Sequence, residues 1–358
     1  MEEIAPGLHR LSIPIEAGGE GWTTSYVFAS ADKSEGIAIL DPGYGTRGAV
    51  EAITAQLAEL GHTPQDVKRI IASHMHPDHM GMSRWLKAHS PGCELIMMGS
   101  ERFPFQQHRT REQGERLQRE WVAKHGLEWT EHTENEPGPE RYGREERELV
   151  QELDASKGDT AQRTEQQASI IARVEPDIRL NDGDEFAFGD WTLRAVWTPG
   201  HTPGHLCIYE PEQKLTFTGD HVLSRITPNV SVGMDDEAIG RSPLREYRAS
   251  LEKIARFDTA RGLPSHQAII DDLPARCLQI LEHHDARLDE VREALGEHPK
   301  NATEVSTTVP WSGTYADFTF FKRRAALGET LSHLQILVED GRARRIEEHD
   351  GRVLWQRI

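Results

Sequence analysis

Short apolar runs alternate with amphipathic stretches along the first part of the chain. Runs rich in β-branched and aromatic residues predict strands at residues 7–15, 24–29, 36–40, 69–73 and 94–98. Between them, residues 48–60 place apolar side chains at helical spacing and end at Gly61, a typical helix C-cap. Residues 83–89 predict a second helix. Strands that alternate with helices indicate an α/β fold with layered sheets and helices.

Strand character returns after residue 177. We expect strands at residues 178–180, 185–188, 191–196, 206–209 and 215–218. Asn181 to Asp184 and Gly189 to Asp190 are predicted to be hairpin turns between the first three of these strands. Helices are expected around residues 243–257 and 273–295.

The segment Gly296 to Pro299 is typical of a domain boundary, and a different order of predicted helices and strands follows it. Residues 302–309 and 324–339 predict helices, and residues 342–346 and 352–356 predict a hairpin. Helices followed by a two-stranded wing form a winged-helix arrangement. We therefore divide the chain into residues 1–272 and a winged-helix-like domain of residues 273–358.

Residues 100–173 differ from both halves in composition. They are rich in Glu, Arg and Gln and contain a Pro-Gly-Pro break at residues 137–139. Modest amphipathic helices are indicated by Leu117, Trp121 and Val122 and by Leu149, Val150 and Leu153. We interpret the segment as a helical insertion, and either a lid over a site or a solvated surface excursion fits this pattern.

The strongest chemical signal follows the strand predicted at residues 69–73. His74, His76, Asp78 and His79 offer imidazole nitrogen and carboxylate oxygen, the ligand types shared by zinc, iron and manganese. In an extended chain His74 and His76 lie on the same side, and Pro77 turns the next two residues towards a second position. The alternative is a group of polar histidines in a turn.

Three later residues repeat this placement of a polar side chain after an apolar run. His201 lies in a Gly- and Pro-rich turn, Asp220 follows the strand at 215–218, and His266 follows Leu263-Pro264. Because an α/β layer gathers strand ends at one edge, we expect these residues to join the first group.

These residues, in this order and spacing, resemble the metal-binding set of the metallo-beta-lactamase fold superfamily across residues 7 to about 270. Residues 273–358 resemble the winged-helix domain of one branch of that superfamily. The resemblance implies a four-layer αββα sandwich with a dinuclear site at one edge. It also implies the following ligands: His74, His76 and His201 for the first metal, Asp78, His79 and His266 for the second, and Asp220 as the bridge.

The implied cofactors are two divalent metal ions, with zinc favoured and iron or manganese compatible with the same ligands. Two such ions lower the pKa of a bridging water and generate hydroxide at neutral pH. Asp78 is the expected catalytic residue, because it can orient that water or take its proton. Class B beta-lactamases carry cysteine at the place of Asp220, and the diiron oxidoreductases carry glutamate at that of His76. These departures argue for a metal-dependent hydrolase other than an antibiotic-degrading or redox enzyme.

Other polar residues near the motifs have weaker assignments. His205 and His221 are expected to support the ligands or to occupy turns, and Asp41 is either a supporting aspartate or a plain turn residue. The histidines expected to be solvated are His108, His132, His283 and His284.

Charge and cysteine content indicate which partners are disfavoured and which cellular compartment is expected. The 358 residues carry a formal charge of -18, which repels polyanions and disfavours nucleic acid as a partner. Cys93, Cys207 and Cys277 are far apart in the sequence and do not suggest a disulfide framework, which is typical of proteins in reducing compartments. The N-terminus lacks the apolar core of a signal peptide, and no apolar run has the length of a membrane span. We expect a cytoplasmic protein with no membrane partner.

Two substrate classes stay open. We favour a small acyl compound, such as a thioester, ester or lactone, for which the insertion would supply a binding wall. The alternative is an RNA endonuclease or phosphodiesterase, since Arg323, Arg324 and Arg342 belong to an arginine-rich region of the second domain. Glutamates and aspartates are interleaved with these arginines, which favours an ordinary mixed-charge surface. The second domain is also a candidate surface for a homodimer.

Overall fold

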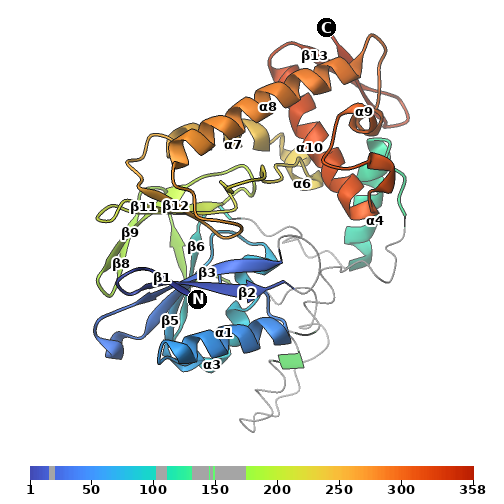
Figure 1. The fold of residues 1–358 in the computed structure, drawn as a ribbon. Coiled ribbons are helices and arrows are strands. Elements are labelled where there is room, and N and C mark those ends of the chain that lie inside the picture. The colour runs from blue at the N-terminus through green and yellow to red at the C-terminus, as the bar shows by residue number, and fades with distance from the viewer. Residues whose placement is uncertain (16–20, 102–110, 131–144, 146–147, 150–174) are drawn as a thin grey trace.

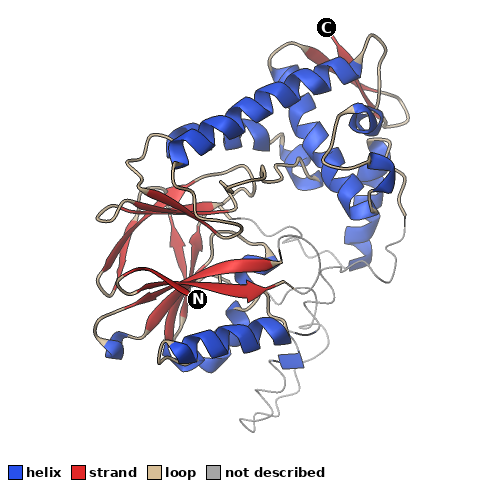
Figure 2. Ribbon diagram, viewed as in Figure 1, coloured by secondary structure: helices blue, strands red, loops and turns tan. Residues whose placement is uncertain are grey.

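The computed structural model describes residues 1–15, 21–101, 111–130, 145, 148–149 and 175–358. Two β-sheets face each other in this part of the chain, and helices cover both outer faces (Figure 1, Figure 2). The termini lie far apart, with the N-terminus at the first sheet and the C-terminus beyond a group of helices (Figure 1).

The first sheet has seven strands in sequence order. They are β1 (Glu2–Ala5), β2 (Leu8–Pro14), β3 (Trp22–Ala29), β4 (Ile37–Leu40), β5 (Val67–Ile71), β6 (Glu94–Met98) and β7 (Ile178–Leu180). The first four are antiparallel, and β4 to β7 are parallel. Parallel neighbours need crossover connections, and α1 (Arg47–Glu59) and α3 (Ser83–His89) supply two of them.

The second sheet has five strands in the order β12-β11-β10-β9-β8. They are β8 (Glu185–Phe188), β9 (Trp191–Trp197), β10 (Leu206–Glu210), β11 (Leu215–Gly219) and β12 (Arg261–Pro264). Only β11 and β12 are parallel, and α7 (Pro243–Ile254) lies on the connection between them. The carboxyl ends of β11 and β12 therefore point the same way.

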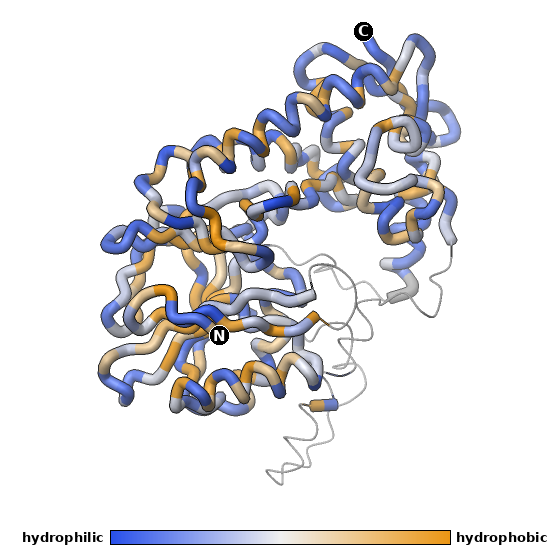
Figure 3. The backbone as a smooth tube through the Cα atoms, viewed as in Figure 1, coloured by the Kyte–Doolittle hydropathy of each residue, from blue (hydrophilic) through white to orange (hydrophobic). Residues whose placement is uncertain are grey.

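The space between the sheets is filled by apolar side chains from both. Tyr26 and Phe28 of β3 meet Phe217 of β11, with ring centroids 5.1 Å and 5.3 Å apart. Along β9 the alternate residues Leu193 and Ala195 are fully buried in this layer. The strands carry the most hydrophobic stretches of the chain, whereas the helices mix hydrophobic and hydrophilic residues (Figure 3).

The outer faces of the sheets are covered by helices with one apolar face. Val50, Ile53 and Leu57 of α1 pack on the first sheet, and Leu244 and Leu251 of α7 pack on the second. The four layers confirm the predicted αββα sandwich. No helix in the described ranges is long and apolar enough to cross a membrane.

Several local predictions differ from the structure. The turn from Asn181 to Asp184 is not a hairpin, because β7 pairs with β6 in the first sheet and β8 with β9 in the second. That turn carries the chain between the sheets. The short strands β1 and β12 and the short helices α2 (Pro77–Met80) and α6 (Met234–Ile239) were not predicted, because such brief elements carry little periodicity.

The C-terminal part consists of helices followed by a hairpin, the order that the sequence predicts. Its elements are α8 (Leu273–Leu295), α9 (Ala302–Thr308), α10 (Phe320–Glu339), β13 (Ala343–Glu347) and β14 (Val353–Arg357). One apolar cluster runs without interruption from α7 through α8 to α10. The boundary at residues 272 and 273 therefore stays a prediction.

The insertion is described only in part. Helix α4 (Arg111–Lys124) contains the predicted Leu117, Trp121 and Val122, and the last two join the apolar cluster of α7, α8 and α10. Val150 and Leu153 lie outside the described residues, and the lid role stays a prediction. Glu237 of α6 accepts hydrogen bonds from Trp121 Nε1 (2.8 Å) and Lys124 Nζ (2.9 Å), which ties α4 to α6.

The prediction that His284 is solvated is wrong. This side chain on α8 is 2% exposed, and its Nδ1 lies 3.2 Å from Nε2 of His333, a fully buried histidine on α10. His283 next to it is half-buried, and His108 and His132 lie outside the described residues. The local sequence around His284 is polar, but packing between α8 and α10 decides its burial.

The buried pair predicts a loss of stability in acid. Burial lowers the pKa of His333 to about 3, so unfolding at pH 5 lets its side chain take up a proton. The free energy of unfolding should fall as the pH drops below the unfolded pKa near 6.5, by up to about 1.4 kcal/mol per pH unit for this group. Denaturant titrations of metal-free protein between pH 8 and pH 5 test this. His333→Gln should have a shallower pH dependence than the natural chain, and an unchanged slope would contradict the assignment.

Candidate metal centre

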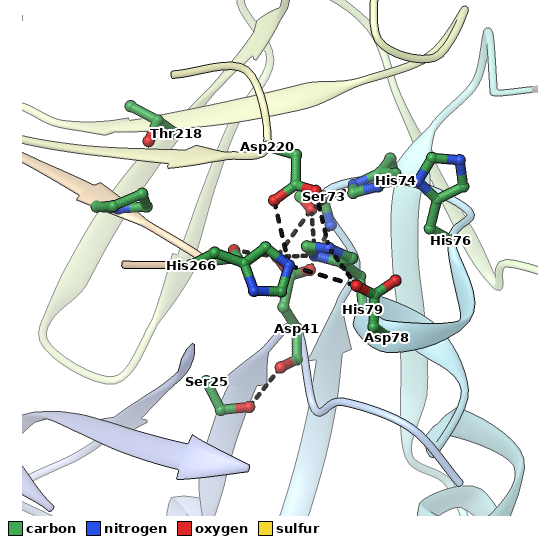
Figure 4. Close-up of polar contacts among 12 residues, drawn as sticks. Ser25, Asp41, Ser73, His74, His76, Asp78, His79, Thr218, Asp220 and His266 are labelled. Atoms are coloured by element: carbon green, nitrogen blue, oxygen red, sulfur yellow. Dashed lines mark hydrogen bonds and ion pairs between the residues drawn. The ribbon is translucent and has the colours of Figure 1, made fainter. Parts of the chain in front are cut away.

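The seven predicted ligands come together at one edge of the sandwich. They follow the ends of β5, β9, β11 and β12 (Figure 4). Three groups of side chains each have ligand atoms within 4.8 Å of one another: His74, His76 and His201; His74, His79 and Asp220; Asp78, His79 and His266. Strands from both sheets thus contribute to one cluster.

The local fold of the first motif explains how it serves two groups. β5 ends at Ile71, the chain bends at residues 73–75, and His76 is the N-cap of α2. Pro77 stands at the start of this helix, where its missing N–H has no cost. The single turn of α2 directs Asp78 and His79 to a second position, as the sequence predicts. The sequence predicted a plain turn here, and the structure has a short helix.

Three imidazole nitrogens converge in the first group. His76 Nδ1 lies 2.8 Å from His74 Nε2 and 3.1 Å from His201 Nε2. Burial lowers the pKa of His74 well below its ordinary value and that of His76 to about 3, so these rings are neutral and present lone pairs. Lone pairs this close repel each other unless a proton or a cation lies between them.

The second group combines two imidazoles with a carboxylate. Asp78 Oδ2 lies 3.3 Å from His266 Nε2 and 3.7 Å from His79 Nε2. Burial opposes ionisation of Asp78, but the neighbouring His79 and His266 lower its pKa to about 2. An ionised carboxylate next to two imidazole nitrogens is a typical donor set for a divalent cation.

Asp220 reaches both groups. Its Oδ2 lies 3.4 Å from His79 Nε2 and 3.8 Å from His201 Nε2, and its Oδ1 lies 3.5 Å from His266 Nε2. The side chain is held between them and is 13% exposed. This position is the one that a bridging ligand requires.

Two buried atoms in the cluster indicate whether a metal ion would fit there. Neither His79 Nε2 nor Asp220 Oδ1 has a hydrogen-bond partner, although both are inaccessible to solvent. Leaving such atoms unsatisfied costs about 1–3 kcal/mol each. Both point into the cluster with nitrogen and oxygen donors around them (Figure 4). The residues present fit divalent cations.

Asp41 is a supporting aspartate and not a plain turn residue. Its fully buried carboxylate accepts hydrogen bonds from Ser73 N (2.8 Å), Ser265 Oγ (2.6 Å) and His79 Nδ1 (2.9 Å). Its φ of 54° is left-handed, and the three donors hold it there. The bond to His79 Nδ1 leaves Nε2 free as a ligand atom.

Backbone carbonyls fix two further histidines. Nδ1 of His201 donates to the Asn229 carbonyl (2.8 Å), and Nδ1 of His266 donates to the Trp22 carbonyl (3.0 Å). In each ring Nε2 is then the atom that faces the cluster. Neither contact could be predicted from the sequence, since a backbone carbonyl has no residue signature.

The loop that carries His201 is anchored by another residue that the sequence analysis missed. Glu101 is 5% exposed and accepts hydrogen bonds from Thr202 Oγ1 (2.7 Å) and Gly204 N (3.3 Å). A Cβ on Gly204 would lie 2.1 Å from the Glu101 nitrogen, so glycine permits this close approach.

His205 and His221 lie behind the ligands. His205 Nε2 accepts a hydrogen bond from Asp220 N (3.2 Å), and its Nδ1 lies 2.9 Å from Thr198 Oγ1. His221 is fully buried, and its ring centroid is 5.6 Å from that of His205. Neither belongs to a group of converging ligand atoms in the described residues, which agrees with a supporting role.

Comparisons with known proteins place this site in a family. The family model of the metallo-beta-lactamase superfamily matches residues 18–266, and that of the metallo-beta-lactamase-like C-terminal domain matches residues 288–358. The chain belongs to the metallo-beta-lactamase superfamily. Membership supports a metal-dependent hydrolase, and members generally bind divalent metals, often zinc.

Two solved structures resemble the whole chain. A metallo-beta-lactamase family protein from Thermus thermophilus is 28% identical, with a TM-score of 0.70, and the match covers 99% of this chain and 100% of that one. A beta-lactamase domain protein from Burkholderia ambifaria is 25% identical, with a TM-score of 0.75, and the match covers 100% of this chain and 93% of that one. Both support the fold of the two parts together.

Curated relatives match over shorter stretches. The lactamase-like protein vrtG of Penicillium aethiopicum is 36% identical over 37% of this chain and 40% of its own length. The beta-lactamase-like protein 2 homolog of Caenorhabditis elegans is 31% identical over 47% of this chain and 52% of its own length. Because the matches span only about half of these relatives or less, their whole-protein activities do not transfer.

The support from Asp41 predicts a specific defect. Asp41→Asn keeps the size and tolerates the left-handed backbone, but it places an amide NH2 among donors of hydrogen bonds. Metal affinity should fall about 10–100-fold while the fold persists, because His79 loses its fixed orientation. Chelator-competition titrations measure this. Asp190→Asn, in an exposed turn, is the control, and equal affinities in the two variants would contradict the role of Asp41.

Proposed function

We propose that the chain is a dinuclear metal-dependent hydrolase that acts on a small acyl compound such as a thioester, ester or lactone. The first ion would be held by His74, His76 and His201, and the second by Asp78, His79 and His266. Asp220 would bridge them. The observation that carries this proposal is the convergence of the seven side chains in three overlapping groups, in which two buried atoms, His79 Nε2 and Asp220 Oδ1, have no hydrogen-bond partner.

The chemistry follows from this donor set. Divalent ions held there would make hydroxide available at neutral pH and polarise a substrate carbonyl. We favour zinc, and iron or manganese also suit these ligands. Asp78 is the proposed catalytic residue, since its carboxylate is ionised and partly accessible, with a side chain 21% exposed. It can accept a hydrogen bond from the attacking water and take its proton.

Two exposed apolar residues near the ligands along the chain or through a backbone contact agree with an acyl substrate. Trp22, whose carbonyl holds His266, is 43% exposed, and Ile226, on the loop after Asp220, is 47% exposed. Exposed apolar side chains of this size are suited to bind a hydrocarbon group.

The charges of the C-terminal part argue against RNA. Arg342 is paired with Asp289 (2.7 Å), Arg345 with Glu237 (3.0 Å) and Arg352 with Glu348 (2.6 Å). Arginines already neutralised by carboxylates do not form the positive surface that a phosphate backbone requires. A cytoplasmic location and a homodimer stay predictions.

Replacement of one ligand tests the metal assignment. The natural chain should hold about two divalent ions, and His76→Ala should hold about one or none, because the first group loses one of its three nitrogens. Elemental analysis of zinc-loaded protein after gel filtration measures the ratio. His349→Ala, an exposed histidine in the hairpin turn, is the matched control. Full metal content in His76→Ala would refute the assignment.

A substrate panel tests the reaction. Acyl thioesters, lactones and single-stranded RNA should be offered to the zinc-loaded protein, to metal-free protein and to His76→Ala. We expect hydrolysis of an acyl compound that needs the metal and falls at least about 100-fold in His76→Ala. Cleavage of RNA alone would overturn the acyl proposal, and full activity without metal would overturn the mechanism.

A further inference from the structure

The loop from Asn229 to Val232 lies between the first group of ligands and the C-terminal part. At one end the Asn229 carbonyl accepts the hydrogen bond from His201 Nδ1 (2.8 Å). The rest of the loop lies against α10. The position of His201 therefore depends on how this loop is held.

Helix α10 holds the loop by three hydrogen bonds. Ser332 Oγ donates to the Val230 carbonyl (2.8 Å), and Val232 N donates to the Gly328 carbonyl (3.0 Å). Ser231 Oγ also lies 3.4 Å from the Ala325 carbonyl. The bonding residues of α10 are spaced three or four positions apart, so they form one face of the helix.

A glycine permits this close contact. A Cβ on Gly328 would lie 2.7 Å from Ser231 Cβ, 2.8 Å from Ser231 Oγ and 3.2 Å from the Val232 carbonyl oxygen. Gly328 also lies in the interior of α10, where glycine is less favourable than alanine by about 1 kcal/mol. The contact with the loop accounts for glycine at this position.

The second group of ligands has no such support from α10. His266 is held by the Trp22 carbonyl of β3, and His79 is held by Asp41, at the end of β4. Both supports lie in the first sheet or directly after it. The two groups therefore differ in which part of the chain orients them.

We propose that α10 is a positioning element for the first metal subsite, acting through Ser332, Gly328 and the Asn229 carbonyl on the tautomer and ring orientation of His201. This proposal rests on the proposed function, because it assumes that His201 is a ligand. It assigns the C-terminal part a role in the metal centre, and it predicts that disturbing the contact releases one ion before the other.

The physical reason lies in the imidazole ring. A neutral histidine carries its proton on either nitrogen, and the bond to the Asn229 carbonyl keeps the proton on Nδ1 and the Nε2 lone pair towards His76. Loss of such an orienting partner typically lowers metal affinity about 10–100-fold. The first ion is then held mainly by His74, His76 and Asp220 and binds more weakly, while the second group keeps its own supports.

Two variants test the proposal by different routes. Ser332→Ala removes the bond to Val230, and Gly328→Ala drives a methyl group into Ser231. Zinc titrations with a competing chelator should show one site weakened about 10–100-fold and the other unchanged. Cobalt-loaded protein offers a second readout, because its visible absorption reports the ligands of each ion.

Controls on the same helix separate this role from general destabilisation. Thr330→Val removes a buried hydroxyl that makes no hydrogen bond, and Leu334→Ala removes apolar packing in the core that α10 shares with α7 and α8. Both should keep the two metal affinities of the natural chain, with a lowered Tm expected only for Leu334→Ala.

The outcomes distinguish this inference from the proposed function. If His76→Ala loses metal but Ser332→Ala and Gly328→Ala bind two ions as the natural chain does, the positioning role is wrong and the metal centre stands. If both sites weaken together in proportion to the loss of Tm, the effect is general and the inference is also wrong. If His76→Ala keeps full metal content, the proposed function itself fails.

Discussion

One electrostatic constraint governs the site: carboxylates and imidazoles, several of them charged, are crowded at one sheet edge and are mostly buried. His79 Nε2 and Asp220 Oδ1 are buried and have no hydrogen-bond partner. A cluster of this kind is unfavourable by itself, because like dipoles and desolvated charges face one another. The cluster is held in place by the carboxylate of Asp41. This carboxylate accepts hydrogen bonds from His79 Nδ1 and from Ser73 and Ser265, which follow the ends of β5 and β12. Divalent cations bound among these ligand atoms would offset the repulsion.

The layers of the fold follow from the need to hold those strand ends rigidly. The parallel pair β11 and β12 delivers Asp220 and His266 side by side, and β5 of the facing sheet delivers the first motif. Apolar packing between and outside the sheets fixes the distance between these edges. The C-terminal helices share the apolar cluster of α7 and reach the loop beside His201. Two parts of the chain that look separate in sequence thus meet at one site.

The sequence predicted which residues gather at this edge, because their motifs follow apolar runs and strand ends meet at an edge; their role as ligands stays a prediction. It could not predict the carbonyls of Trp22 and Asn229, since any residue has a carbonyl and only the folded chain places it. His284 was misjudged because its local surroundings are polar, while its burial is decided by a helix many residues away. The turn at Asn181 was misjudged for a similar reason: turn chemistry shows that the chain reverses, but pairing with β6 or β9 decides the sheet.

In the proposed centre two ions share this cluster through Asp220. Anomalous diffraction from crystals of zinc-loaded protein tests it most directly. We expect two zinc peaks, one about 2.0–2.1 Å from His74 Nε2, His76 Nδ1 and His201 Nε2, and one at similar distances from Asp78, His79 and His266, with an Asp220 oxygen near both. A single peak, or two peaks with Asp220 hydrogen-bonded elsewhere, would contradict it.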